Sequence, residues 1–243
     1  MRRVTEDTAM HDVTPSESTP GSPGERTVDV VIVGTGAGGL TGALVAKSCG
    51  LEVLVLEKAE HIGGTSAWSG GVLWAPDNDL MRAAGVQDSA EDALRYLDAV
   101  VGESGGPATA PARREAYVRA IPEVIRFLER MGVRFVYADG AIDYYPEKPG
   151  GHHRGRSVNA KMFDTRELGD WEPLFRPRQE GAVFPVVLAH YAEAPPMATM
   201  TRGVRGARVA AKVLGRTVWG LLRRKRLVSL GAGLMARLLL AAK

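Results

Sequence analysis

The feature that most constrains this chain is the stretch from Val28 to Lys58, VDVVIVGTGAGGLTGALVAKSCGLEVLVLEK. An apolar run breaks into a glycine-rich turn and continues through small residues to Ser48. The chain then turns at Gly50 into a second apolar run, which Glu57 closes. This order predicts a strand, a helix and a parallel second strand.

The glycine spacing of the first turn is typical of a dinucleotide-binding loop. Gly34 permits a tight turn, Gly36 lets the backbone approach a pyrophosphate, and Gly39 lets the helix pack closely on the strand. The helix N-terminus presents unpaired N–H groups to the phosphates. Glu57 lies after the last glycine of the turn, Gly39, at nearly the spacing of roughly 20 residues that is expected for a carboxylate that binds ribose hydroxyls. Its charge would repel the extra phosphate of NADP, which leaves NAD and FAD.

A second loop rich in glycine and hydroxyl groups, HIGGTSAWSGG, follows at residues 61–71. Its amides and the hydroxyls of Thr65, Ser66 and Ser69 can hold an extended diphosphate and the edge of a flavin. A simple NAD-binding unit has no role for such a loop, so the pattern favours FAD. An ordinary surface loop is the alternative.

The chain has 243 residues, of which 45% are hydrophobic and 24% charged, enough for one globular domain and part of a second. Residues 1–27 are polar and are predicted to form a disordered arm, with no signal peptide. The single cysteine, Cys49, fits a reducing compartment, so a cytoplasmic location is expected.

Further elements are predicted downstream of the two loops. A short strand covers residues 72–76, and Ser89 begins a helix as its N-cap. The apolar face of that helix is expected to comprise Ala90, Leu94, Leu97 and Val101. Another helix follows Pro111, is split or kinked at Pro122, and leads into a strand at residues 133–137. The basic loop 150–157 is interpreted as a solvated loop or an anion contact, because no metal-ligand spacing surrounds its two histidines.

These residues carry a resemblance. The glycine-rich run, then GGTSAWSGG, AYV, DYYPE, GRSVN and LGD, resembles the N-terminal half of flavoproteins related to fumarate reductase and succinate dehydrogenase. Within them it is most similar to the 3-ketosteroid 1-dehydrogenases. The resemblance implies an α/β fold, with a Rossmann-like FAD-binding domain whose parallel sheet is incomplete. Its expected parts are the FAD-binding domain at 28–145, the start of a substrate or cap region at 146–200, and a basic amphipathic helical tail at 201–243.

The resemblance also implies the cofactor site, which would bind FAD. The pyrophosphate would be held by Gly34, Gly36, Ala37, Gly38 and Gly39, the ribose by Glu57 and the adenine side by Lys58. The diphosphate and flavin would be held by Gly63, Gly64, Thr65, Ser66, Ser69, Gly70 and Gly71. Gly64 stands where related enzymes with covalent FAD carry a histidine, so the flavin is expected to be noncovalent.

Tyr144, the first tyrosine of DYY, matches an active-site tyrosine of the steroid dehydrogenases. In that chemistry a ketone acidifies the adjacent C–H, a tyrosine removes the proton, and hydride leaves for the flavin. Tyr144 would support proton removal through its hydroxyl. The alternative is an aromatic packing residue whose hydroxyl is satisfied.

The family needs a second half that completes the FAD site and supplies the proton-abstracting tyrosine, and no such segment precedes Lys243. We therefore expect little activity without a complementing C-terminal half. The substrate is expected to be a small molecule, such as a ketosteroid. The alternatives are a non-catalytic FAD-binding or membrane-associated remnant and a fumarate reductase-like flavoprotein.

The tail contains eleven Lys and Arg after Glu193 and no acidic residue. At helical spacing Arg205, Arg208, Lys212 and Arg216 share one face, opposite Ala207, Ala211, Leu214 and Val218. Such a helix could lie on the inner face of an anionic membrane, or pack on the missing half. Residues 227–242 are too short to span a bilayer. Nucleic-acid binding is not expected, because Trp219 alone could stack on bases.

Overall fold

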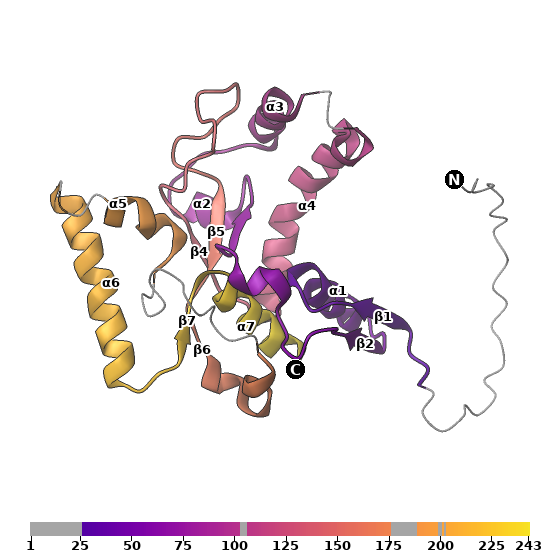
Figure 1. Ribbon diagram of the computed structural model, residues 1–243. Coiled ribbons are helices and arrows are strands. Elements are labelled where there is room, and N and C mark those ends of the chain that lie inside the picture. Colours follow the sequence, from indigo (N-terminus) through magenta and orange to yellow (C-terminus); the bar gives the residue numbers. More distant parts are fainter. Residues whose placement is uncertain (1–25, 103–105, 176–188, 199–200, 202) are drawn as a thin grey trace, which may run out of the picture.

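A computed structural model describes residues 26–102, 106–175, 189–198, 201 and 203–243. Most of the predicted N-terminal arm lies outside these residues. The predicted strand–helix–strand unit is confirmed as β1 (Val30–Val33), α1 (Ala37–Ser48) and β2 (Val53–Leu56). The two strands pair in parallel with Val30 opposite Val53, and α1 packs on one face of the pair (Figure 1).

The other strands form two small antiparallel sheets. Three of them, β3 (Val72–Trp74), β4 (Phe135–Tyr137) and β5 (Ser157–Ala160), pair in the order β3–β5–β4. β5 lies beyond the domain boundary predicted at residue 145 but joins strands that precede it. The short strands β6 (Phe163–Asp164) and β7 (Leu227–Val228) pair with each other.

Helices of two kinds connect and cover these sheets. The α-helices are α2 (Asp79–Ala83), α3 (Ala90–Val101), α4 (Pro111–Arg130), α5 (Ala194–Ala198), α6 (Val204–Leu222) and α7 (Leu230–Ala242). The 3₁₀ segments are η1 (Gly64–Trp68), η2 (Pro107–Thr109), η3 (Thr165–Leu174) and η4 (Tyr191–Glu193).

The structure tests two helix predictions. Ser89 caps α3 as predicted, and the residues of its predicted apolar face are partly buried. The fully buried residues of α3 are Ala93 and Tyr96, and Tyr96 packs toward Trp74 on β3. Pro122 does not split α4, which runs unbroken from residue 111 to 130. The lost N–H bond at Pro122 is offset by burial of four apolar side chains along the helix. These are Val118, Ile121, Ile125 and Leu128.

α7 lies at the centre of the molecule, between α1 and the β3–β5–β4 sheet (Figure 1). Its residues are apolar on nearly every side, which is the pattern of a helix surrounded by protein. Leu234, Met235, Leu238 and Leu239 are buried, and the helix contacts α1, η1 and β5. The tail therefore divides into a surface helix, α6, and a core helix, α7.

α6 packs on the rest of the protein through a face that is neither the predicted basic face nor the predicted apolar one. Its buried residues are Gly206, Val213, Thr217 and Gly220, a face of mostly small side chains. The predicted apolar face is exposed, with Leu214 64% and Val218 44% accessible. Among the described residues, no helix combines the length and apolar character needed to cross a membrane.

The parallel sheet is incomplete, as the resemblance implied. On the face away from α1, Val31 is 53% and Val33 84% exposed, and Leu56 at the end of β2 is 48% exposed. Within the described residues, β1 and β2 pair only with each other. Such open edges and apolar faces are places where further chain can add.

Candidate functional site

The first glycine turn has the geometry predicted from its sequence. Gly34 adopts φ 94°, which favours glycine. A Cβ on Gly39 would overlap the carbonyl oxygen of Gly34, so only glycine allows α1 to start this close to β1. Leu40 makes the first intrahelical bond, to the Gly36 carbonyl. The N–H groups of Gly38 and Gly39 precede that bond and are available to an anion.

Glu57 joins this turn to the second loop. Its Oε2 accepts bonds from the N–H (2.9 Å) and the hydroxyl of Thr35, and its Oε1 accepts from the Ala59 N–H at 2.9 Å. Thr35 Oγ1 in turn accepts from the Gly63 N–H at 3.1 Å. The bonds to Ala59 and then to Thr35 lower the pKa of Glu57 to about 2. The carboxylate is therefore ionised and held in one position beside the first glycine turn.

The lowered pKa gives a pH-dependent prediction. Because the folded pKa lies below the ordinary 4.5, ionised Glu57 stabilises the fold above about pH 4.5 and loses this effect as pH falls toward 2. We expect Glu57→Gln to be less stable than wild type at pH 6 and equal to it near pH 2, measured by urea unfolding. Glu52→Gln is the control, since Glu52 makes only an exposed pair with Arg26. A stability difference that persists at pH 2 would contradict the prediction.

The second loop packs directly on the first. Ser66 Oγ accepts the N–H of Ala37 at 3.1 Å, and Ser69 Oγ bonds the Ser66 carbonyl and the Gly71 N–H. The Ser66 hydroxyl therefore joins the two loops and the Ser69 hydroxyl stabilises the second one. Each hydroxyl can still form a further hydrogen bond. Thr65 and Lys58 are exposed. The Gly231 N–H of α7 donates to the Ser69 carbonyl at 3.0 Å, and this bond fixes the second loop on the buried helix α7.

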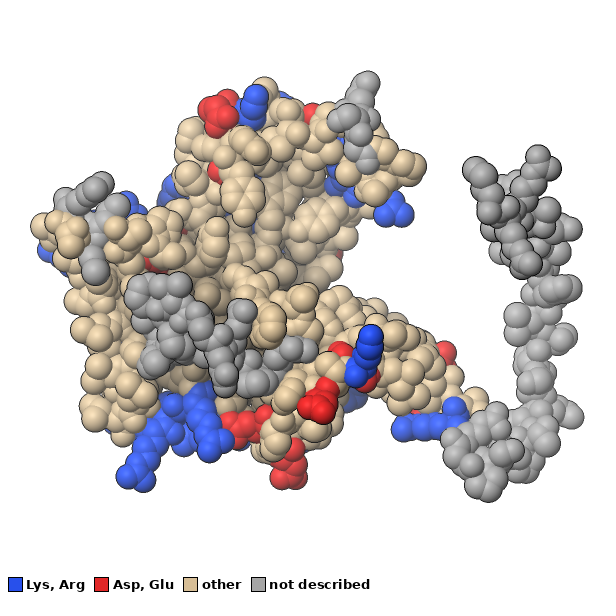
Figure 2. Space-filling model, in the orientation of Figure 1, with Lys and Arg blue, Asp and Glu red and all other residues tan. Residues whose placement is uncertain are grey.

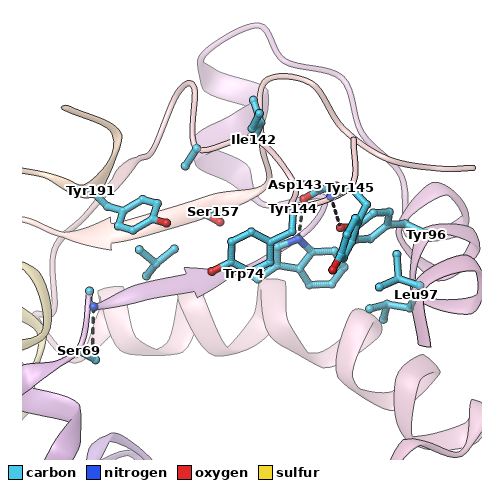
Figure 3. A pocket seen from close by; sticks show the side chains of 15 residues that line it. Ser69, Trp74, Tyr96, Leu97, Ile142, Asp143, Tyr144, Tyr145, Ser157 and Tyr191 are labelled. Atoms are coloured by element: carbon cyan, nitrogen blue, oxygen red, sulfur yellow. Dashed lines mark hydrogen bonds between the residues drawn. The ribbon is translucent and has the colours of Figure 1, made fainter. Parts of the chain in front are cut away.

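A pocket of about 450 Å³ opens beside the second loop (Figure 3). Ser69, Gly70, Gly71 and Val72 line it together with Trp74 of β3. The remaining wall is largely aromatic, and comprises Tyr96, Tyr144, Tyr145 and Tyr191 with Leu97, Val100, Ala141, Ile142, Asp143 and Ser157. In the view of Figure 2, charged side chains lie mainly around the periphery of the described part of the molecule. The pocket suits an apolar ring compound with few polar groups.

Tyr144 lines this pocket and is 87% exposed. The structure thus brings Tyr144 and the predicted cofactor loop to one pocket, although 73 residues separate Gly71 from Tyr144 in the sequence. Tyr191, which the sequence did not single out, faces the same pocket. Burial, and then the neighbouring Tyr144, raise the pKa of Tyr191.

Within loop 150–157, which was interpreted as solvated or anion-binding, His153 and Arg154 are exposed but Arg156 is buried. Its side chain is 1% exposed and pairs with Asp88 at 2.8 Å and Asp143 at 2.7 Å. It also donates to the Gly150 carbonyl and lies over the Trp74 ring. Sequence spacing gave no sign of this cluster, because Asp88 is 68 residues from Arg156. Among the described residues, no three His, Cys, Asp or Glu gather as metal ligands.

Comparison with known proteins agrees with this geometry. Residues 29–239 match the family described as FAD binding domain, which covers both glycine loops, Glu57 and the pocket. The chain belongs to this FAD-binding family. The predicted Rossmann-like fold and the predicted flavoprotein resemblance are thereby confirmed.

Members of the family similar to this chain include ketone dehydrogenases. A 3-oxosteroid 1-dehydrogenase of Mycobacterium tuberculosis is 38% identical over 86% of this chain and 37% of its own length. A 4-oxocyclohexanecarboxylate 2-dehydrogenase of Sinomonas cyclohexanicum is 41% identical over 61% of this chain and 25% of its own. A crystal structure of 3-ketosteroid delta1-dehydrogenase from Sterolibacterium denitrificans, in complex with 1,4-androstadiene-3,17-dione, superposes with TM-score 0.73 at 32% identity. The superposition covers 88% of this chain and 38% of the crystallised one. This chain therefore spans well under half the length of these relatives.

Proposed function

We propose that this chain forms the FAD-binding part, and one wall of the substrate pocket, of a dehydrogenase that removes hydrogen next to a ring ketone. The observation that carries the proposal is the pocket shared by the second glycine loop and Tyr144. The relatives act on steroid and cyclohexane ketones by name, which supports a ketosteroid or similar alicyclic ketone as the substrate.

The residues present fit FAD. The Gly34–Gly39 turn brings the start of α1 close to β1, an approach that a side chain at Gly39 would block, and its N–H groups would bind the pyrophosphate, with ionised Glu57 at the ribose. Lys58 would approach the adenine side. The diphosphate and flavin would lie along the second loop, on Gly63, Gly64, Thr65, Ser66, Ser69, Gly70 and Gly71. FAD supplies the hydride acceptor of such a reaction.

Tyr144 would act on the substrate itself. Its exposed hydroxyl lies at the pocket, where it can take part in removing the proton next to the ketone. An ordinary tyrosine has a pKa of about 10, so donors around the oxygen are needed to favour its ionised form. Trp74 and Tyr96 would contact the apolar rings and exclude water from the reacting carbon.

Binding of the cofactor is directly testable. We expect the purified chain, incubated with FAD and passed through a desalting column, to retain visible flavin absorbance. Because Gly64 replaces the attachment histidine, acid precipitation should release the colour to the supernatant. A folded chain that retains no flavin would overturn the proposal, and flavin that remains with the precipitate would overturn noncovalent attachment.

Turnover requires a separate test, because the relatives extend well beyond this chain. We propose that a polypeptide corresponding to the rest of their length adds to the open β1–β2 sheet, whose Val31 and Val33 are exposed. With an artificial electron acceptor and a 3-ketosteroid, the chain alone should give little product and the two together much more. Full turnover by the chain alone would contradict the need for a complement. No turnover by both together would contradict the dehydrogenase assignment.

We also propose that α6 makes peripheral contact with an anionic membrane. Leu214 is 64% and Leu221 60% exposed on one side, with Arg208 and Lys212 on another. We expect the chain to float with acidic vesicles but not with neutral ones, and Leu214→Gln to float less. Absence of wild-type chain from the floated acidic vesicles would rule this contact out.

A further inference from the structure

Asn159 is a buried polar residue at the centre of the site and is not among the residues predicted from the sequence. It lies on β5, opposite Val72 of β3, and is 1% exposed. A buried amide requires partners for both its donors and its acceptor. Here they come from two different segments around the pocket.

The amide nitrogen of Asn159 donates to the cofactor loop. Nδ2 lies 3.0 Å from the Gly71 carbonyl oxygen and 3.3 Å from that of Gly70. The loop cannot easily shift to find other partners, because a Cβ on Gly71 would already overlap the backbone of Leu230 and Gly231. The Asn159 amide therefore fixes the direction of these two peptide groups beside the pocket.

The amide oxygen of Asn159 accepts from the opposite wall. The N–H of Tyr191 donates to Oδ1 at 3.2 Å. The Tyr191 ring lies against the same loop, since a Cβ on Gly70 would be 3.4 Å from its Cδ2 atom. Glu193, two residues further on, pairs with Arg216 of α6 at 2.6 Å and holds this segment in place.

We propose that Asn159 is a positioning residue that joins the cofactor loop to the Tyr191 wall of the substrate pocket. One side chain sets both the carbonyls of Gly70 and Gly71 and the position of Tyr191. The inference rests on the proposed function, because it takes the second glycine loop as the place of the flavin. Because Asn159 holds the Tyr191 backbone, the Tyr191 side chain would in turn determine the shape of the pocket.

Asn159→Asp tests the donor role through pH. A neutral aspartic acid can donate to the Gly71 carbonyl, whereas the ionised form places a negative charge against two carbonyl oxygens. Burial raises the pKa of such a carboxyl, so the switch should fall in an accessible range. We expect FAD affinity of Asn159→Asp to be near that of wild type at low pH, and to weaken about tenfold or more as pH rises.

Matched variants separate this role from general damage. Asn159→Leu should bind FAD weakly at every pH, and Glu52→Gln, which alters only an exposed ion pair with Arg26, should bind like wild type. The neighbouring titratable groups His190, Tyr191 and Glu193 are the same in wild type and in Asn159→Asp. The pH dependence of FAD affinity in wild type therefore measures their contribution. Circular dichroism melts at each pH check the fold of each variant.

The outcomes distinguish the inference from the function. A wild-type chain that folds but binds no FAD would end both. Wild type that binds FAD, with Asn159→Asp equally tight at all pH values, would end the inference alone. If Asn159→Asp does not fold, hydrogen exchange on wild type decides: added FAD should protect the Tyr191 amide along with the Gly70–Gly71 segment, and an unchanged Tyr191 amide would contradict the coupling.

Discussion

Replacing Arg156 by methionine should lower the free energy of unfolding by about 3–5 kcal/mol, the usual cost of removing one partner from a buried ion pair. Arg156 is 1% exposed, and the two carboxylates that it pairs with are equally inaccessible. Without the guanidinium, Asp88 and Asp143 would face each other uncompensated in a water-poor site. Methionine fills similar volume, so the loss would reflect charge and hydrogen bonds.

The same substitution should also disturb the pocket. Asp143 precedes Tyr144, accepts the Trp74 indole N–H at 2.8 Å and accepts the His152 N–H at 2.9 Å. Release of Asp143 would therefore free the segment that presents Tyr144. We expect quenching of Trp fluorescence by a soluble agent to increase in Arg156→Met at denaturant concentrations where it remains folded.

Arg154→Met provides the matched control. Arg154 is two residues away and makes a two-bond pair with Asp139, but both side chains are about half exposed. Exposed pairs contribute about 0–1 kcal/mol, so this variant should unfold close to wild type in urea. Equal, small losses in both variants would contradict a structural role for the Arg156 cluster.

Gly39→Ala is the second substitution with a large expected effect, and we expect it to lose retained FAD. The new Cβ would overlap the Gly34 carbonyl oxygen, so α1 must move away from β1 or the turn must open. Overpacking of this kind costs about 1–3 kcal/mol of stability. The displaced N–H groups of the first helical turn would no longer converge on a pyrophosphate. Flavin absorbance after desalting measures the loss.

Gly42→Ala is the control in the same helix. Its Cβ would meet nothing closer than Ile32 Cδ1 at 3.7 Å, an ordinary contact. Alanine also favours helix over glycine by about 1 kcal/mol, so this variant should be slightly more stable and bind FAD normally. If Gly39→Ala retained FAD as well as Gly42→Ala, the close approach of α1 and β1 would not matter for the cofactor.

Local order along the chain predicted much of the geometry of the two glycine loops, the candidate cofactor site. The glycines of the first turn, the strand before them and Glu57 after them lie within 30 residues, so their geometry follows from one strand–helix–strand unit. Thr35 was missed as a partner of Glu57, because the bond depends on how the turn folds back over the end of β2. The residues that α3 and α6 bury most deeply were not predicted either, since each helix buries the residues that its neighbours reach.

The sequence by itself determined the parallel β1–β2 pair, the glycine cradle and the ionisable acid, because backbone sterics and short-range spacing impose them. Tertiary structure alone decided that Arg156 is buried between two aspartates, that Asn159 joins two walls, and that Tyr144 shares a pocket with Gly71. These contacts join residues between 13 and 89 positions apart, where no spacing rule applies. Packing around the apolar helix α7 brings them together, and burial then requires each polar group to find a partner.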